Sequence, residues 1–343
     1  MHGICSINTT GMALTQKQRF SLLFMPPKEA WEDFMDKKML FVYNPMAGKE
    51  QIRNNLSDII QVFCNAGYEI TIFSTNGAGD ATRIVAEKGK DYGYIVCSGG
   101  DGTMNEVATG LMKLDKCPVC GYIPAGTVND FASSLKIPKT MKEAAELITY
   151  GSIFECDMGQ FNDRNFTYVA GFGAFTEVSY QTPQEWKNAL GKVAYFAEAL
   201  KHISDIKPHH MTIKSGDELY EDTFILGLVS NSVSVAGFKA YSKKNIKMDD
   251  GKFEAIFIRN PKNPIEIQQV LNSLLSKQLD APQILYLSSS QISISSEDDV
   301  QWTLDGEDGG ICSYAEIKNL KQALPIICDK CAYAEVSCKY DET

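Results

Sequence analysis

The order of apolar and polar positions changes character near residue 155 and divides the chain into two patterns. In the first, apolar runs of strand length at 39–45, 68–75, 92–100 and 119–127 each lead into a turn. Apolar residues recur at helical spacing between these runs. Strands that alternate with helices of this length predict a parallel sheet covered by helices on both faces.

Helices are expected at 52–63, at 79–89, from Thr103 onward and at 141–151. Gly67 suits the position just past the end of the first helix, because glycine readily adopts the left-handed conformation found there. Thr140 and Glu143 have the spacing of a capping box, in which a hydroxyl and a carboxylate cap the first turn of a helix.

From Cys156 onward the pattern is mainly that of strands. The segments SGDE (215–218) and DDGK (249–252) are typical of hairpin turns. Helical segments are expected near 185–206 and 263–278. The predicted fold class is therefore an α/β N-terminal domain followed by a mainly antiparallel β domain.

These patterns suggest domain limits. Residues 1–36 show no periodicity and are expected to be a loosely ordered extension; Met35 would serve equally well as a natural start. The α/β domain is expected at 37–155 and the β-rich domain at 156–312. The segment 313–328 is expected to return to the first domain, and 329–343 forms a tail without an assigned role.

The turn GGDGTMNE (99–106) separates an apolar run from a helix. Glycines there expose the N–H groups of a helix N-terminus, an arrangement that binds anions such as phosphate. Asp101 is out of place beside a phosphate unless a cation or a proton transfer is involved. The turns at 44–49, 74–81 and 124–130 fall at other strand ends, which meet at one edge of a parallel sheet. The sequence therefore predicts a phosphate pocket at this edge.

Composition narrows the range of partners. The net charge of −10 argues against nucleic acid bound by bulk electrostatics. No apolar run approaches the roughly 20 residues of a membrane-spanning helix, and no signal peptide is recognisable. The 10 cysteines are more typical of reduced thiols than of a disulfide scaffold. The pairs Cys117/Cys120 and Cys328/Cys331 leave a zinc site open.

GGDGTMNE, with NPMAG before it and PAGTVND after it, resembles the diacylglycerol kinase catalytic family, in particular its soluble bacterial lipid kinases. The segments 155–175, 247–258 and 302–310 resemble later motifs of that family in the same order. The likeness runs from about Met39 to Pro325. It implies an NAD-kinase/diacylglycerol-kinase-like first domain and transfer of the γ-phosphoryl group of ATP to a lipid hydroxyl, with diacylglycerol as the expected acceptor.

The resemblance also implies residue roles. Asp101 would bind the catalytic Mg²⁺, directly or through water, and Glu307 would be the base, tuned by burial. Asp130 and Asp157 would order water and metal. The nucleotide site would comprise Asn44, Pro45, Met46, Ala47, Gly48, Thr75, Gly100, Asp101, Gly102, Thr103, Met104, Asn105, Glu106 and Thr127.

The loop KMDDGKF resembles a structural metal site of the family. Its ligands would be the carboxylate of Asp250 and the backbone carbonyls of Lys247 and Lys252, completed by waters, as suits a hard cation. A plain Asp-Gly turn would have the same sequence. Likewise, the segment around Glu307 could be a hairpin turn with a solvated glutamate.

Other functions remain open from the sequence. NAD kinases share the GGDGT turn, but Asn105 and Glu106 follow it at once here, which favours the lipid kinase. A non-catalytic nucleotide-binding regulator would be expected to lack Asp101 or Glu307, and both are present.

The resemblance leaves several acceptors open. Sphingoid bases and phosphatidylglycerol would use the same machinery as diacylglycerol. The acceptor cleft is expected between the domains and could include GFGAF (171–175), whose Phe172 and Phe175 equally suit a core. We expect a cytoplasmic protein that meets its lipid at the inner membrane face. A homodimer is left open.

Overall fold

The computed structural model describes residues 37–173, 206–231, 234–235, 238–239, 247–276 and 279–329. The expected N-terminal extension lies outside these ranges. The same holds for nearly all of the expected helix near 185–206 and of the C-terminal tail.

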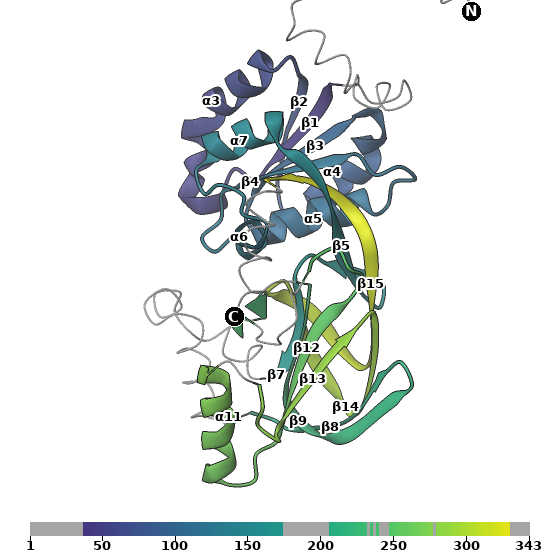
Figure 1. The fold of residues 1–343 in the computed structure, drawn as a ribbon. Helices are drawn as coiled ribbons and strands as arrows, with labels where there is room; N and C mark the ends of the chain where they lie inside the picture. The colour runs from purple at the N-terminus through teal and green to yellow at the C-terminus, as the bar shows by residue number, and fades with distance from the viewer. Residues whose placement is uncertain are drawn as a thin grey trace, which may run out of the picture. The chain divides into compact units, whose positions relative to one another are not determined.

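Residues 38–150 alternate between strands and helices, as expected (Figure 1). Strands β1 to β4 pair in parallel in the order β2-β1-β3-β4. The elements are β1 (Lys38–Tyr43), η1 (Ala47–Glu50), α3 (Gln51–Asn65), β2 (Glu69–Ser74), α4 (Asp80–Lys88), η2 (Gly89–Asp91), β3 (Tyr94–Gly99), α5 (Asp101–Leu111), β4 (Val119–Pro124), α6 (Asp130–Ser134) and α7 (Met141–Tyr150).

The helix expected from Thr103 begins earlier, at Asp101. Gly100 is its N-cap, and the Gly100 carbonyl accepts the first helical hydrogen bond, from the Met104 N–H at 3.0 Å. The prediction missed this because the apolar stripe begins later than the backbone turn. The short helix α6 was not expected either, because PAGTVND reads only as a turn.

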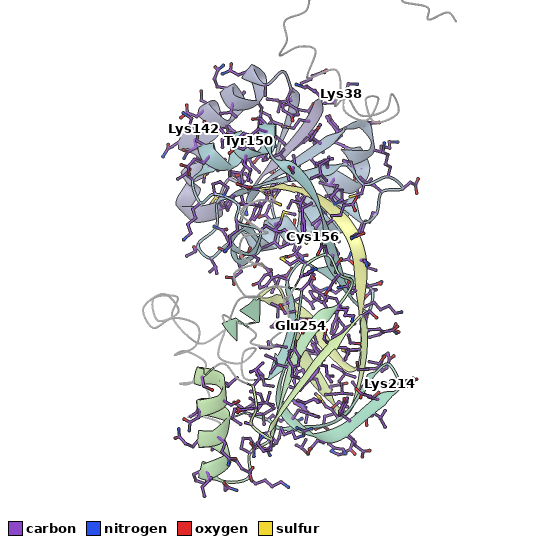
Figure 2. All side chains as sticks on the ribbon, in the orientation of Figure 1. Lys38, Lys142, Tyr150, Cys156, Lys214 and Glu254 are labelled. Carbon is purple, nitrogen blue, oxygen red and sulfur yellow. The ribbon has the colours of Figure 1, made fainter. Side chains whose placement is uncertain are left out.

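The half of the predicted capping box that the Thr140 hydroxyl supplies is confirmed at the start of α7. The Thr140 hydroxyl accepts a 3.4 Å bond from the Glu143 N–H and donates a 2.6 Å bond to the Glu143 carboxylate. Gly67 follows α3 with φ +80°, as its position predicts. Tyr150 at the end of α7 is 72% exposed (Figure 2).

Residues from 152 onward are mainly strands, as expected. The SGDE hairpin is confirmed by the register Ser215↔Glu218. The DDGK segment leads into a strand. Residues 240–246, directly before it, lie outside the described part, so the predicted hairpin stays a prediction. The elements are β5 (Ser152–Phe161), β6 (Arg164–Phe166), β7 (Val169–Gly173), β8 (His209–Ser215), β9 (Glu218–Ser230), β10 (Ser234–Val235), β11 (Phe238–Lys239), β12 (Phe253–Arg259), α11 (Pro264–Ser276), β13 (Ile284–Ser289), β14 (Gln291–Leu304) and β15 (Glu307–Cys328).

The long strand β15 joins the two patterns. It pairs with β14 over its first half, with β5 along its second half, and in parallel with β4 through Ile326↔Cys120. Its register shifts between Leu320 and Leu324, where Gln322 has φ +54°. The described strands therefore form one hydrogen-bonded 13-stranded sheet, with the two-stranded β10–β11 pair apart from it.

Separate apolar clusters fill the interior. Residues of β1, β3, β4 and the surrounding helices form one. A second lies between strands of the β-rich part, where Phe172 and Trp302 meet with ring centroids 5.0 Å apart. Phe172 is therefore a core residue, whereas Phe175 lies outside the described part. A third cluster places Val270 and Leu274 of α11 on Ile256 and Ile258 of β12.

Among the described residues, no helix is long and apolar enough to cross a membrane. No group of His, Cys, Asp and Glu in that part could hold a metal ion through side chains alone. Cys120 is buried with a strongly raised pKa, caused mainly by burial. A thiolate zinc site at Cys117/Cys120 therefore finds no support, and Cys331 lies outside the described residues.

The cap of α7 yields a stability prediction. Replacing Thr140 by Ala removes the hydroxyl that accepts from the Glu143 N–H, and should lower the free energy of unfolding by about 1 kcal/mol. Thr140→Ser keeps the hydroxyl and is the matched control. Urea unfolding measures both; equal loss in the two variants would contradict the capping role.

Candidate functional site

The N-terminus of α5 lies at the edge formed by the carboxyl ends of β1, β3 and β4. The first N–H groups of a helix have no partner within it and are free to bind an anion. The PAGTVND turn approaches this terminus closely: a Cβ added at Gly126 would lie 2.6 Å from the Cα of Gly100. A side chain at position 126 would therefore push the two turns apart.

The NPMAG turn is joined to the same helix. The Asn44 amide donates to the Thr103 hydroxyl at 3.3 Å, and the Asn44 side-chain oxygen accepts from the Met46 N–H at 2.9 Å. Gly48 has φ +54°, and a Cβ there would lie 1.9 Å from the Ala125 carbonyl oxygen. Glycine is thus required at position 48 on both conformational and steric grounds.

Asn129 shapes the PAGTVND turn from within. Its side chain accepts from the Gly126 N–H at 3.0 Å and donates to the Gly126 carbonyl at 2.8 Å. Its φ of 53° lies in the left-handed region, which asparagine tolerates better than most residues. Asn129 is not among the residues predicted from the sequence, although an asparagine in a glycine turn is a recognised turn signal.

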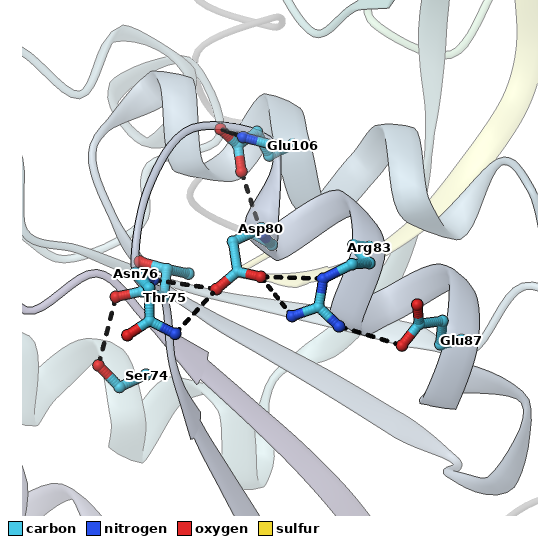
Figure 3. Close-up of polar contacts among 9 residues, drawn as sticks. Ser74, Thr75, Asn76, Asp80, Arg83, Glu87 and Glu106 are labelled. Carbon is cyan, nitrogen blue, oxygen red and sulfur yellow. Dashed lines mark hydrogen bonds and ion pairs between the residues drawn. The ribbon is translucent and has the colours of Figure 1, made fainter.

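The STNGAGDA turn is held by carboxylates (Figure 3). The Asn76 N–H donates to Asp80 at 2.9 Å, and the pKa of Asp80 is lowered first by this bond and next by Arg83. Glu106 accepts from the N–H groups of Gly79 and Ala81, at 2.7 and 3.1 Å. Glu106 therefore holds the start of α4, a role different from the nucleotide contact implied by the resemblance.

The remaining predicted nucleotide residues differ in accessibility. Met46 is 66% exposed, whereas Met104 is fully buried, so its backbone alone could face a ligand. Thr75 is nearly buried and donates its N–H to the Tyr43 carbonyl at 2.9 Å. Thr127 is exposed, and Pro45 and Ala47 are half-buried. The predicted residues thus border the same edge but are not equally available.

Asp101 is placed where the charge of its carboxylate is partly offset. It accepts from the N–H groups of Asp130 and Phe131 at the start of α6, at 3.1 and 3.3 Å. Burial nevertheless dominates and raises the pKa of Asp101 to about 6. Besides the cation or proton transfer expected from the sequence, these backbone N–H donors offset the charge of Asp101.

Glu307 lies against the first turn of α5. A Cβ added at Gly102 would be 2.6 Å from Oε1 of Glu307. The two residues are 205 positions apart in the sequence, so tertiary structure brings them together. The expected burial of Glu307 is wrong for this structure: the residue follows the tight β14–β15 turn and is exposed.

Asp305, in the same turn, was not named from the sequence. It is 5% exposed, and one carboxylate oxygen accepts from the Thr167 N–H and hydroxyl at 2.6 and 2.7 Å. The other accepts from the N–H groups of Tyr168 and Val169 at 2.9 and 3.0 Å. The amide of Asn105 donates to the first oxygen at 2.6 Å. Asn105 therefore contacts the β-rich part.

Acidic groups gather around Tyr168. Burial raises the pKa of this tyrosine most, followed by the negative charges of Asp305, Asp130, Asp101 and Glu307. Carboxylates that share a site favour a bound divalent cation, which reduces their repulsion. Carboxylate oxygens are ligands that Mg²⁺ prefers, but no group of three or more His, Cys, Asp or Glu side chains in the described part could hold the ion alone, so waters or phosphate oxygens would have to complete its coordination.

The predicted metal loop is built differently from the phosphate edge. Asp157, fully buried, accepts from the Gly251 N–H at 2.6 Å and from the Gln322 N–H at 2.7 Å. The exposed Asp250 carboxylate accepts from the Lys252 N–H at 2.9 Å. The metal ligands expected at Lys247, Asp250 and Lys252 stay a prediction. Asp157 thus holds the loop, and its pKa is raised mainly by burial.

A cavity of about 300 Å³ lies beside the PAGTVND turn. Its lining comes from that turn, α3 and the start of α7: Asn55, Pro124, Ala125, Gly126, Asn129, Lys139, Thr140 and Met141. The predicted nucleotide residues do not line it. Four of its lining residues nevertheless belong to the PAGTVND turn, so the cavity adjoins the phosphate edge.

Comparisons with known proteins agree with this geometry. The family model of the diacylglycerol kinase catalytic domain matches residues 38–161. A diacylglycerol kinase of Bacillus subtilis is 32% identical over 296 residues, covering 86% of this chain and 97% of the relative. One from Staphylococcus saprophyticus is 33% identical over 294 residues, covering 85% and 95%. The crystal structure of a diacylglycerol kinase from Bacillus anthracis is similar with a TM-score of 0.72 at 27% identity, covering 87% of this chain and 99% of the other.

Gly48→Ala should separate the NPMAG and PAGTVND turns. The added Cβ meets the Ala125 carbonyl, and the left-handed backbone disfavours alanine, so we expect a loss of more than about 2 kcal/mol in the free energy of unfolding. Gly77→Ala is the control, because the space around a Cβ there is open. Urea denaturation compares them; a Gly48→Ala variant as stable as Gly77→Ala would disprove the close contact.

The raised pKa of Asp101 predicts a pH effect in metal-free buffer. In the folded protein the pKa of Asp101 is about 6, whereas the ordinary pKa of an aspartate carboxyl is 3.8. Since the native state binds more protons between these values, stability falls as pH rises through this window. Therefore, as the pH rises from 4 to 7.5, the free energy of unfolding of Asp101→Asn should increase by about 1–3 kcal/mol relative to that of the wild type. Urea unfolding at both pH values measures this, and a constant difference would contradict it.

Proposed function

This chain belongs to the diacylglycerol kinase catalytic family, and we propose that it transfers the γ-phosphoryl group of ATP to the hydroxyl of diacylglycerol, forming phosphatidic acid. Curated relatives that cover most of the chain are named diacylglycerol kinases. The observation that carries the proposal is the contact of the Glu307 carboxylate with Gly102 at the start of α5.

The phosphates of ATP are assigned to the turns at the edge of the parallel sheet. In this proposal the phosphates are surrounded by the first N–H groups of α5 and by the NPMAG and PAGTVND turns. The sheet that carries these turns is covered by helices on both faces. Fixed donors suit phosphoryl transfer, whose catalysis rests on positioning and on stabilisation of charge. The links from Asn44 to Thr103 and from Asn129 to Gly126 support such rigidity.

Glu307 is assigned the role of base. Its carboxylate would accept the proton of the lipid hydroxyl as that oxygen attacks the phosphoryl group held at α5. Exposure in this structure leaves the carboxylate accessible to an incoming acceptor. Apo geometry of a catalytic group often tightens when the substrates bind.

Asp101 would hold the catalytic Mg²⁺, and the loop of Lys247, Asp250 and Lys252 a structural one. Bound Mg²⁺ neutralises charge that develops on the phosphoryl oxygens. Asp130 lies close enough to raise the pKa of Asp101 through its charge, which supports a shared role. Asp157 would keep the metal loop in place through the Gly251 N–H.

The acceptor would be met at the membrane surface. A chain with no helix in its described part that could span a membrane, acting on a lipid, needs peripheral contact with the bilayer. The cytoplasmic face of the inner membrane is the expected place, since ATP is the phosphoryl donor. A homodimer stays a prediction.

The test offers γ-labelled ATP and Mg²⁺ with mixed micelles containing diacylglycerol, and in parallel micelles containing a sphingoid base or phosphatidylglycerol, and NAD. Label in the organic phase with diacylglycerol is expected. Glu307→Gln should lower the rate by about 10²–10⁴-fold, because it removes the base. EDTA should abolish transfer.

Glu297→Gln, an equivalent change at an exposed position of β14, is the control and should keep wild-type activity. Label on another lipid would change the acceptor but keep the mechanism. Label on NAD would overturn the lipid-kinase proposal. Wild-type rates in Glu307→Gln would remove Glu307 from the mechanism.

A further inference from the structure

The Asp305 carboxylate lies where every contacting group is a donor. The N–H groups of Thr167 and Tyr168, just before β7, and of Val169, its first residue, donate to it, as does the Thr167 hydroxyl. An asparagine could present a single oxygen here and would turn its NH₂ group toward N–H donors. The position therefore requires a carboxylate, and its charge strengthens each bond.

This carboxylate anchors the turn that carries Glu307. Leu304 pairs with Glu307, so Asp305 and Gly306 alone form the connection between β14 and β15. Their φ angles are 52° and 85°, as a two-residue hairpin turn of this kind requires. Because the Asp305 side chain is buried and held on both oxygens, the tip of the hairpin cannot shift without breaking these bonds.

Asn105 extends the anchor to α5. Its amide nitrogen donates to Asp305 at 2.6 Å and to the Asn165 carbonyl at 3.1 Å. Residues three apart share a helix face, so Gly102 and Asn105 both face the hairpin. Gly102 meets Glu307 while Asn105 meets Asp305. The hairpin is thus aligned with the helix at two points, one turn apart.

We propose that Asp305 and Asn105 form a positioning pair that holds the Glu307 carboxylate in register with the phosphate-binding end of α5. The inference rests on the proposed function of Glu307 and deepens it. Neither residue of the pair takes part in proton or phosphoryl transfer. Asn105 then links the helix to the hairpin. The resemblance had implied a different role, that of a nucleotide ligand.

A purely structural role would give a different result from a positioning role. Loss of a buried bond lowers stability, whereas a misplaced base lowers kcat and leaves nucleotide binding intact. Displacement of a reacting group by about 1 Å costs on the order of 10²-fold in rate. Asn105 is half-exposed and gives the cleaner variant, because Asp305 variants leave buried N–H donors unpaired.

The experiment measures kcat, the KM for ATP and the urea midpoint of Asn105→Ala and Asp305→Asn. Asn105→Ala should lose about 10²-fold in kcat with its KM for ATP within about threefold of wild type. In Asp305→Asn the kcat should fall by at least the same factor. Asp308→Asn is the matched control: its carboxylate lies in the same hairpin but accepts from Gln301 and the Gly310 N–H. It should retain wild-type kinetics.

An unchanged kcat in Asn105→Ala would overturn the positioning pair. If the KM for ATP rose at the same time, Asn105 would be a nucleotide ligand. Hydrogen–deuterium exchange of residues 302–310 gives a readout independent of activity. Exchange at the hairpin should rise in Asn105→Ala but not in Asp308→Asn. Unchanged exchange in Asn105→Ala would overturn the inference, whether or not the wild type phosphorylates a lipid. A wild type that phosphorylates no lipid would refute only the proposed function.

Discussion

The arrangement of the site depends on the burial of one carboxylate, that of Asp305. A buried charge without partners costs several kcal/mol, so this side chain is stable only when its donors surround it. Those donors come from the start of β7 and from α5, and the carboxylate itself belongs to the β14–β15 turn. The hairpin, the strand and the helix must therefore assemble together, and Glu307 is carried to α5 as a consequence.

Close approach of backbones is the second constraint. At Gly48 and Gly126 a Cβ would meet main-chain atoms of the neighbouring turn, and at Gly102 it would meet Glu307. The phosphate edge is thus assembled from turns that touch each other directly, with no side chains between them. Bonds from Asn44 and Asn129 hold these turns in place. Rigid donors of this kind suit a reaction that needs charge stabilisation with little reorganisation.

The same edge concentrates negative charge. Asp101 is buried enough that its pKa rises to about 6 in spite of the two N–H groups that it accepts from. Other carboxylates raise the pKa of the adjacent Tyr168. Such a cluster lowers stability in the absence of a cation. A loss of this kind is typical of sites in which function and stability compete.

The sequence by itself determined the local elements. Apolar periodicity, the Thr140 cap, the SGDE turn and the glycine-bearing strand ends are set by neighbouring residues, and their positions were predicted to within a few residues. The resemblance carried by GGDGTMNE and the segment 302–310 identified the family and proposed Glu307. Only the tertiary structure decided what those residues contact. Glu106 holds the start of α4, Asp101 faces α6, and β15 crosses from β14 to β4. Asp305 and Asn105, 200 positions apart, meet because a buried charge requires donors, and chain periodicity carries no information about which distant donors supply them.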